Sequence, residues 1–236
     1  MGQRDAGDST PDSTLGSANS TLSLVTLLVL VMAAFFTGLS GGNLMAWHGR
    51  LGLAILGLLV FRLIWGLIGS TYARFSQFVR GPTVIVDYLH GRWHGIGHNP
   101  LGALSVLALL GLLLCQVASG LFADDDIAFQ GSLTVLVSTE TSIWLTRLHR
   151  QSIWIIGALI ALHVGAVLWH ALIRKENLIK PMLNGRQAVS DPTAQPARGG
   201  YLSALLFALA LSVLVVWIAD GGLLSSPPAP ASLPNW

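Results

Sequence analysis

The stretch LHRQSIWIIGALIALHVGAVLWH, residues 148–170, is almost entirely apolar and yet carries three histidines. It overlaps an apolar run over 153–173 that is long enough to cross a bilayer, because a hydrocarbon layer of ~30 Å needs ~20 apolar residues in a helix. On an α-helix, the sequence separation of His149 and His163 is close to four turns, or ~21 Å. Both imidazoles therefore lie on one face at two depths. Ionisable groups are costly inside a membrane and are first interpreted as functional.

The composition indicates an integral membrane protein of the all-α class. Of 236 residues, 53% are hydrophobic and 10% are charged, and the mean hydropathy is +0.65. Soluble domains carry about 25% charged residues. The basic residues form no stripe, so we expect no nucleic-acid binding, and the single cysteine excludes a disulfide framework. Four further apolar runs are long enough to span a bilayer: 22–39, 51–69, 101–122 and 202–218.

The distribution of Lys and Arg predicts the topology of these five spans. Basic residues concentrate between the second and third runs and between the fourth and fifth, whereas the segment 40–47 has none. By the positive-inside rule, the N-terminus lies inside and the C-terminus outside. We expect five segments: a disordered cytoplasmic tail over 1–20, a transmembrane bundle over 21–185, a cytoplasmic linker over 186–200, a fifth transmembrane helix over 201–219 and a Pro-rich external tail over 220–236.

The second span repeats the spacing of the fourth. His48 and Arg62 have the same separation in sequence as His149 and His163, and both helices run from outside to inside in the predicted topology. His48 and His149 therefore lie at one outer depth, and Arg62 and His163 at one inner depth. Two facing histidines in a helix bundle suggest ligation of a haem iron by two imidazoles. Arg62 would then pair with a haem propionate.

Each of these residues also has a structural interpretation. A histidine in a transmembrane helix is often a hydrogen-bonding partner of a neighbouring helix. We interpret His170, which closely precedes Arg174, as an interfacial residue.

Two polar clusters lie outside the apolar runs. The segment YLHGRWHGIGHNP, 88–100, spaces His90, His94 and His98 four apart, but its Gly and Pro residues favour an inner-surface loop over a metal-binding helix. The acidic connection with Asp124, Asp125 and Asp126 faces outside. It either docks a basic redox partner or forms a solvated turn.

Three stretches resemble one family: HGRLGLAILGLLVFRLIWGLIGSTYARFSQFVRGP (48–82), GHNPLGALSVLALLGLLLCQVASGLF (97–122) and LHRQSIWIIGALIALHVGAVLWHALIRKENLIKPMLNG (148–185). They resemble the bacterial, di-haem cytochrome b561 family, which includes the b-type cytochrome subunits of nickel–iron hydrogenases. The resemblance implies a four-helix transmembrane bundle that holds haem b non-covalently. We therefore expect an all-α integral membrane protein, with this haem-binding bundle and a fifth, C-terminal transmembrane helix.

The resemblance also implies the ligands. The positions of His48 and His149 match those that hold the outer haem, and His163 matches one ligand of the inner haem. The family's other inner ligand is a His near the inner end of the first helix, but residues 22–24 offer none and no histidine precedes His48. Three alternatives stay open: the inner haem is absent, His163 holds it alone, or a partner subunit or His170 supplies the second bond.

The expected function is that of a membrane-bound b-type cytochrome in a respiratory chain. It would pass electrons between quinone or quinol and an external redox protein, such as a c-type cytochrome or a hydrogenase-like subunit, in the lipid of the bacterial inner membrane. It would be an electron-transfer subunit rather than a stand-alone enzyme. One alternative is a degenerate membrane anchor or assembly subunit with one haem or none. Another is a single-subunit oxidoreductase acting on a small external oxidant.

Overall fold

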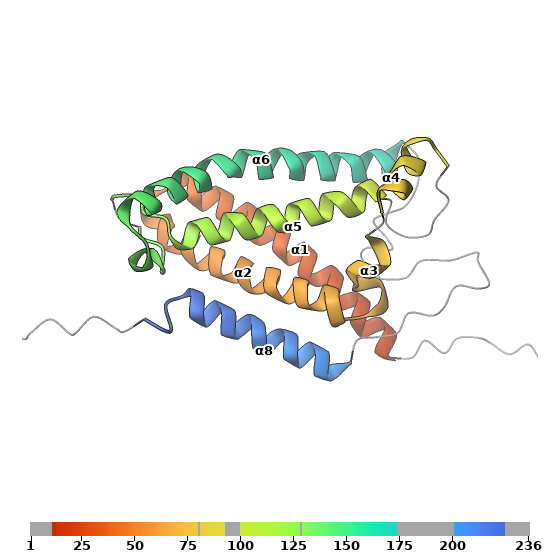
Figure 1. The fold of residues 1–236 in the computed structure, drawn as a ribbon, viewed down its shortest axis with the longest axis horizontal. Coiled ribbons are helices and arrows are strands. Elements are labelled where there is room, and N and C mark those ends of the chain that lie inside the picture. The colour runs from red at the N-terminus through yellow and green to blue at the C-terminus, as the bar shows by residue number, and fades with distance from the viewer. Residues whose placement is uncertain (1–10, 80, 93–99, 128, 174–200, 225–236) are drawn as a thin grey trace, which may run out of the picture.

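The computed structural model describes residues 11–79, 81–92, 100–127, 129–173 and 201–224. In this part of the chain, long helices run side by side (Figure 1). Each contains an apolar window long enough to cross a membrane, which confirms the predicted all-α membrane architecture with five spans. These helices are α1 (Pro11–Ser40), α2 (Met45–Ile68), α5 (Pro100–Leu121), α6 (Thr139–Leu172) and α8 (Leu202–Ala219).

Short elements join the long helices at the two ends of the bundle (Figure 1). Gly41 and Gly42 have φ angles of 65° and 54°, a region that glycine enters without steric cost. They allow the chain to reverse within a few residues, so that α1 and α2 pack as antiparallel neighbours. The short elements are η1 (Gly42–Leu44), η2 (Thr71–Ala73), α3 (Phe75–Phe78), α4 (Pro82–Leu89) and η3 (Thr134–Leu136).

Two helices begin earlier than the hydropathy pattern predicts. α6 has 34 residues, or ~51 Å, and begins at Thr139, well before the apolar run that starts at Ile153. The side chain of Ser138 accepts a hydrogen bond from the Thr141 amide at 3.3 Å and caps this polar first turn. α1 begins at Pro11, so residues 11–20 of the expected disordered tail are helical. A helix nucleated in the membrane propagates beyond it, because each further residue adds a backbone hydrogen bond.

The bundle interior is apolar at its centre. Leu59 of α2 and Ile156 of α6 are both fully buried, and Leu113 of α5 packs in the same cluster. A second cluster joins α2 to α8, where Phe61 and Trp65 pack against Ala208. α8 therefore lies along α2, on the side away from α6 (Figure 1).

Most expected boundaries outside the bundle cannot be compared with the structure. α8 (Leu202–Ala219) corresponds to the expected fifth helix over 201–219. The expected linker over 186–200 and the tail beyond residue 224 lie outside the described residues.

Candidate functional site

Two histidines far apart in the sequence lie together at one end of the bundle. His48 stands in the first turn of α2, and His149 stands in the first half of α6. Their ring centres are 5.9 Å apart, with the ring planes at 90°. We call this level the outer level, after the predicted topology. The inner level is that of Arg62 and His163, about four turns further along the same two helices.

The hydrogen bonds of both rings define one tautomer. The Nδ1 atom of His48 lies 2.9 Å from the backbone oxygen of Ala34 in α1. The Nδ1 atom of His149 lies 2.8 Å from the backbone oxygen of Gln116 in α5. A carbonyl oxygen only accepts, so each Nδ1 carries the proton and donates. The Nε2 atom of each neutral ring keeps its lone pair, which is the state that binds a metal.

The neighbouring side chains hold this pair in place. Gln116 donates from Nε2 to the backbone oxygen of His149 at 3.0 Å, and its Oε1 accepts from the hydroxyl of Ser152. These bonds tie α5 to α6 at the level of the His149 ring. On the other side, Phe129 approaches His48 edge-on with ring centres 6.5 Å apart. The connection between α5 and α6, which carries Asp124, Asp125 and Asp126, therefore lies directly against the pair. We call this segment the outer connection.

The inner level holds His163 in a similar way. The Nδ1 atom of His163 lies 2.8 Å from the hydroxyl oxygen of Ser105, and that hydroxyl donates to the backbone oxygen of Gly102 at 2.8 Å. The Ser105 hydroxyl thus joins the imidazole of His163 to the backbone of α5. When its proton points to Gly102, Nδ1 of His163 donates and Nε2 keeps its lone pair.

Arg62 is a buried cation with an unused donor. Only 6% of it is exposed. Its Nη1 donates to the backbone oxygen of Ala73 at 3.1 Å, its guanidinium lies 5.6 Å from the ring centre of Phe75, and its Nε has no hydrogen-bond partner. Among the described residues, no carboxylate lies within ion-pair distance of Arg62. A buried charge of this kind is costly unless an anion or acceptor joins it.

The comparisons with known proteins give one match. Residues 21–185 match the family model of prokaryotic cytochrome b561. The chain belongs to the prokaryotic cytochrome b561 family. No curated protein and no solved structure matches it. The match confirms the resemblance read from the sequence and extends it to α1, although the first-helix His motif of the family is missing. α8 lies outside the matched range.

Members of the cytochrome b561 family bind haem b, and the outer level fits that group. Two neutral imidazoles are a suitable axial pair for haem iron. His48 and His149 would hold the iron of a haem bound at this level, because their ring centres lie only 5.9 Å apart. Arg62 at the inner level, with its unpartnered Nε, fits a haem propionate.

The inner level lacks the second histidine of the cytochrome b561 pattern. α1 and α2 are antiparallel, and Thr37 approaches His48. The α1 residue at the level of Arg62 is therefore found near Ser23, about four turns before Thr37. His170 cannot take the missing place, because it lies beyond His163 on the unbroken helix α6, ~10.5 Å further along the axis. Two ligands of one iron must face each other across it.

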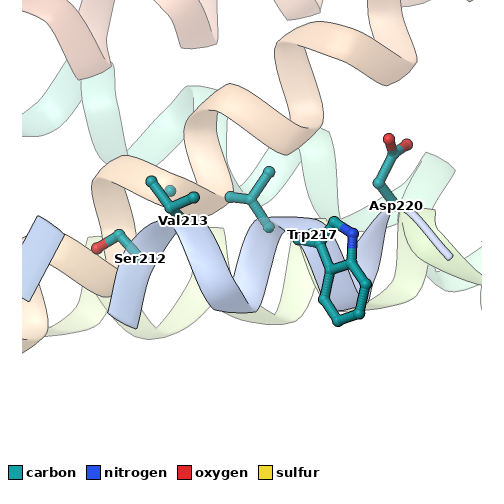
Figure 2. Close-up of a pocket in the computed structure, with 6 residues that line it drawn as sticks. Ser212, Val213, Trp217 and Asp220 are labelled. Carbon is teal, nitrogen blue, oxygen red and sulfur yellow. The ribbon is translucent and has the colours of Figure 1, made fainter. Parts of the chain in front are cut away.

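Two other candidate sites in the described part of the chain contain neither Arg62 nor any of the histidines of the outer and inner levels. The groove between α2 and α8 (Figure 2) has a volume of about 270 Å³ and a mainly apolar lining. Asp220 is the acid at its rim, and no histidine lines it. Of the histidine cluster at 88–100, His90 is exposed and its Nδ1 lies 2.8 Å from the backbone oxygen of Val86, whereas His94 and His98 lie outside the described residues.

Sequence reasoning missed the polar residues that hold the histidines. Those in α1 and α5 look like ordinary small or polar residues within an apolar run, and one aromatic residue of the outer connection, Phe129, was missed with them. One signal was available, because Ser105 and Ser119 of α5 have the same separation in sequence as the two α6 histidines that they approach. The missed residues are Thr37, Gln116, Ser119, Ser105 and Phe129.

Proposed function

We propose that this cytochrome b561 family member is a membrane-bound b-type cytochrome, which transfers electrons between quinone or quinol and a redox partner at its outer face. The observation that carries the proposal is the pair of His48 and His149 with both Nδ1 protons committed to carbonyl oxygens. In this tautomer each ring keeps a lone pair on Nε2, the atom that would bind a metal. A haem held there supplies a one-electron carrier, and the residues around it orient the two ligands and exclude water.

The inner level is proposed as a second site. His163 would provide one ligand, and Arg62 would bind a propionate through its free Nε. The second ligand stays open, since the level of Ser23 on α1 carries no imidazole. The alternatives are a haem held by His163 alone, a ligand from a partner subunit, and an inner level without haem.

The proposed partners follow from the two ends of the bundle. Quinone or quinol would reach the protein from the membrane lipid. An external redox protein, such as a c-type cytochrome or a hydrogenase-like subunit, would dock on the outer connection, where Asp124 and Asp126 adjoin Phe129 and hence His48. We place the chain in the bacterial inner membrane, with its N-terminus cytoplasmic and its C-terminus periplasmic.

A second candidate function is that of a membrane anchor or assembly subunit with one haem or none. Two observations favour it: the missing first-helix histidine and the extra helix α8 beyond the matched range. In this role the outer pair would be a structural remnant.

The deciding experiment is a haem titration of the purified full chain. We expect a reduced-minus-oxidised spectrum of b-type haem, and we expect His48→Ala and His149→Ala each to remove the outer haem completely. His90→Ala, at the end of a short helix away from the pair, is the matched control and should retain the haem of the unmodified chain. A chain that binds no haem in haem-supplied cells would support the anchor role instead. Retention of the full haem content in both variants would refute the assignment of His48 and His149 as ligands.

A further inference from the structure

The helices α1 and α5, which pack against the two outer histidines, share one local arrangement. In each, a backbone carbonyl is followed three residues later by a hydroxyl and four residues later by a glycine, and all three contact one imidazole. The two sets occupy the last turns of their helices, and they stand opposite each other across the outer pair. The sets are Ala34, Thr37 and Gly38 in α1, and Gln116, Ser119 and Gly120 in α5.

The first set holds His48. Its Nδ1 lies 2.9 Å from the oxygen of Ala34 and 3.5 Å from the hydroxyl oxygen of Thr37. The Thr37 hydroxyl donates to its own helix, at 2.9 Å from the oxygen of Ala33. Its lone pair therefore faces the Nδ1–H group of the imidazole.

The second set holds His149 with almost the same distances. Nδ1 lies 2.8 Å from the oxygen of Gln116 and 3.3 Å from the hydroxyl oxygen of Ser119. The Ser119 hydroxyl donates to the oxygen of Gln116 at 2.9 Å. Both imidazoles thus meet a carbonyl and a hydroxyl of the same geometry, although the two segments share only the final hydroxyl–glycine pattern.

The glycines make this geometry possible. A Cβ atom added at Gly38 would lie 2.9 Å from Cε1 and 3.0 Å from Nδ1 of His48. A Cβ atom added at Gly120 would lie 2.9 Å and 3.1 Å from the same atoms of His149. Side chains do not tolerate contacts this short, so each ring occupies the space of a missing side chain.

We infer that Gly38 and Gly120, with Thr37 and Ser119, are the positioning residues of the outer haem site. This inference rests on the proposed function of that site. The glycine sets how closely each ring approaches its neighbouring helix, and the carbonyl and hydroxyl set its rotation and tautomer. Together they fix where the Nε2 atom of each ring lies, and Nε2 is the atom that would bind the haem iron. Such outer partners orient metal-bound imidazoles and raise their basicity, so they also influence the reduction potential of the haem.

The substitution of alanine separates positioning from folding. A methyl group at Gly38 or Gly120 displaces a ring at the end of a side chain with two rotatable bonds, which moves more easily than the backbone. Alanine is also the better helix former. We therefore expect Gly38→Ala and Gly120→Ala to leave the helices intact while the ring loses its hydrogen bond and its alignment.

The experiment compares these two variants with Gly52→Ala in α2 and Gly111→Ala in α5. A Cβ atom at either control position meets nothing within 4 Å. Each full-length protein is purified with its haem, and haem per chain, the low-spin haem spectrum, the midpoint potential and the melting temperature are measured. We expect at least a twofold loss of outer low-spin haem, or a shifted potential, in both test variants. The controls should match the unmodified chain, and the melting temperature of the haem-free proteins should not fall.

Two hydroxyl substitutions give a second readout. Thr37→Val and Ser119→Ala keep the packing close to its original shape but remove the hydroxyl group, whereas Thr37→Ser and Ser119→Thr retain a hydroxyl. We expect the reduction potential of the outer haem to shift in the two variants without the hydroxyl. In the two variants that retain it, the potential should match that of the unmodified chain. If Gly38→Ala or Gly120→Ala accumulates poorly, this pair decides the question.

The outcomes separate this inference from the proposed function. If the unmodified chain binds haem and His48→Ala removes it, the proposed site stands. If the glycine and hydroxyl variants then behave like Gly52→Ala and Gly111→Ala, the positioning role is wrong. Equal haem loss in the control variants would also overturn it.

Discussion

Single atoms decide the chemistry of the histidines in this chain. In three of them Nδ1 forms a hydrogen bond with an oxygen of a neighbouring helix, and these oxygens belong to Ala34, Gln116 and Ser105. A membrane interior provides no water to satisfy such groups, so each polar atom needs a protein partner. The Nε atom of Arg62 lacks such a partner, so this buried cation is a candidate to bind an anionic group of a ligand.

The tautomer of His163 is testable without haem. The Ser105 hydroxyl is within 2.8 Å of both the Gly102 oxygen and Nδ1 of His163, and we predict that its proton points to Gly102 and that Nδ1 carries the shared proton. We expect ¹⁵N NMR of the haem-free chain to show His163 as the Nδ1–H tautomer. Ser105→Ala should reduce the population of this tautomer, and Ser105→Thr should restore it. An unchanged His163 signal in Ser105→Ala would show that the hydroxyl does not select the tautomer.

Substitution of Arg62 should change the melting temperature differently in the haem-free and the haem-loaded protein. In the haem-free chain, Arg62→Met removes a buried, unpaired charge, so the melting temperature should rise or stay constant. In the haem-loaded chain the same change removes a charge-assisted bond of about 1.5–3 kcal/mol, so the melting temperature should fall. Arg50→Met, at an exposed position of the same helix, is the control. Equal shifts in both states would mean that Arg62 binds no part of the haem.

At the scale of elements, the helices form two antiparallel hairpins with matching registers. On α5 and α6, Ser119 approaches His149 and Ser105 approaches His163, so both levels belong to one unbroken register. α8 stands outside these hairpins and packs on α2 through small residues, as transmembrane helices commonly do. The residues of this contact, Phe61 and Trp65 of α2 and Ala208 of α8, lie away from the outer level, since Phe61 follows His48 by more than three turns of α2.

Ala208 tests whether α8 stabilises the bundle without serving the haem site. Ala208 is fully buried against Phe61 and Trp65, so Ala208→Leu overpacks the contact and should destabilise the chain by about 1–3 kcal/mol. Ala210→Leu, on the exposed side of the same helix, should have no effect. The measurements are the melting temperature in detergent and haem per chain. Loss of outer haem in Ala208→Leu, without unfolding, would show that α8 does contribute to the site.

At the scale of the whole molecule, the apolar surface and the basic connections determine how the chain sits in a membrane. Large apolar side chains are exposed along all five long helices, for example Phe36, Leu162 and Val213. In water this surface would be a liability, but in lipid it is the expected exterior. Outer and inner levels then lie at two depths of one bilayer, ~21 Å apart along the helices.

The five candidate spans found among the described residues predict that residues before α1 and residues after α8 lie on opposite sides of the membrane. A reporter active only in the periplasm should work when fused after Trp236 and fail when fused after Gly185, because the segment between them contains α8. A reporter that fluoresces only in the cytoplasm should give the reverse pattern. Activity of the periplasmic reporter at both positions would contradict the predicted orientation.

Much of the architecture could be predicted from local sequence. Spans follow from runs of apolar residues, and the two depths follow from the equal spacings of His48 with Arg62 and of His149 with His163. The family could be named from the same stretches. These features are local or periodic, so they need no knowledge of which helix neighbours which.

The tertiary structure alone decided what surrounds the histidines. No spacing within α2 or α6 shows that Gly38 and Gly120 make room for the rings, or that Gln116 ties α5 to α6. The place of α8 beside α2 was likewise decided only by packing, and the early start of α6 was seen only in the structure. The physical reason is range: the cost of burying an imidazole is a property of the residue, whereas its hydrogen-bond partner and packing space belong to another helix.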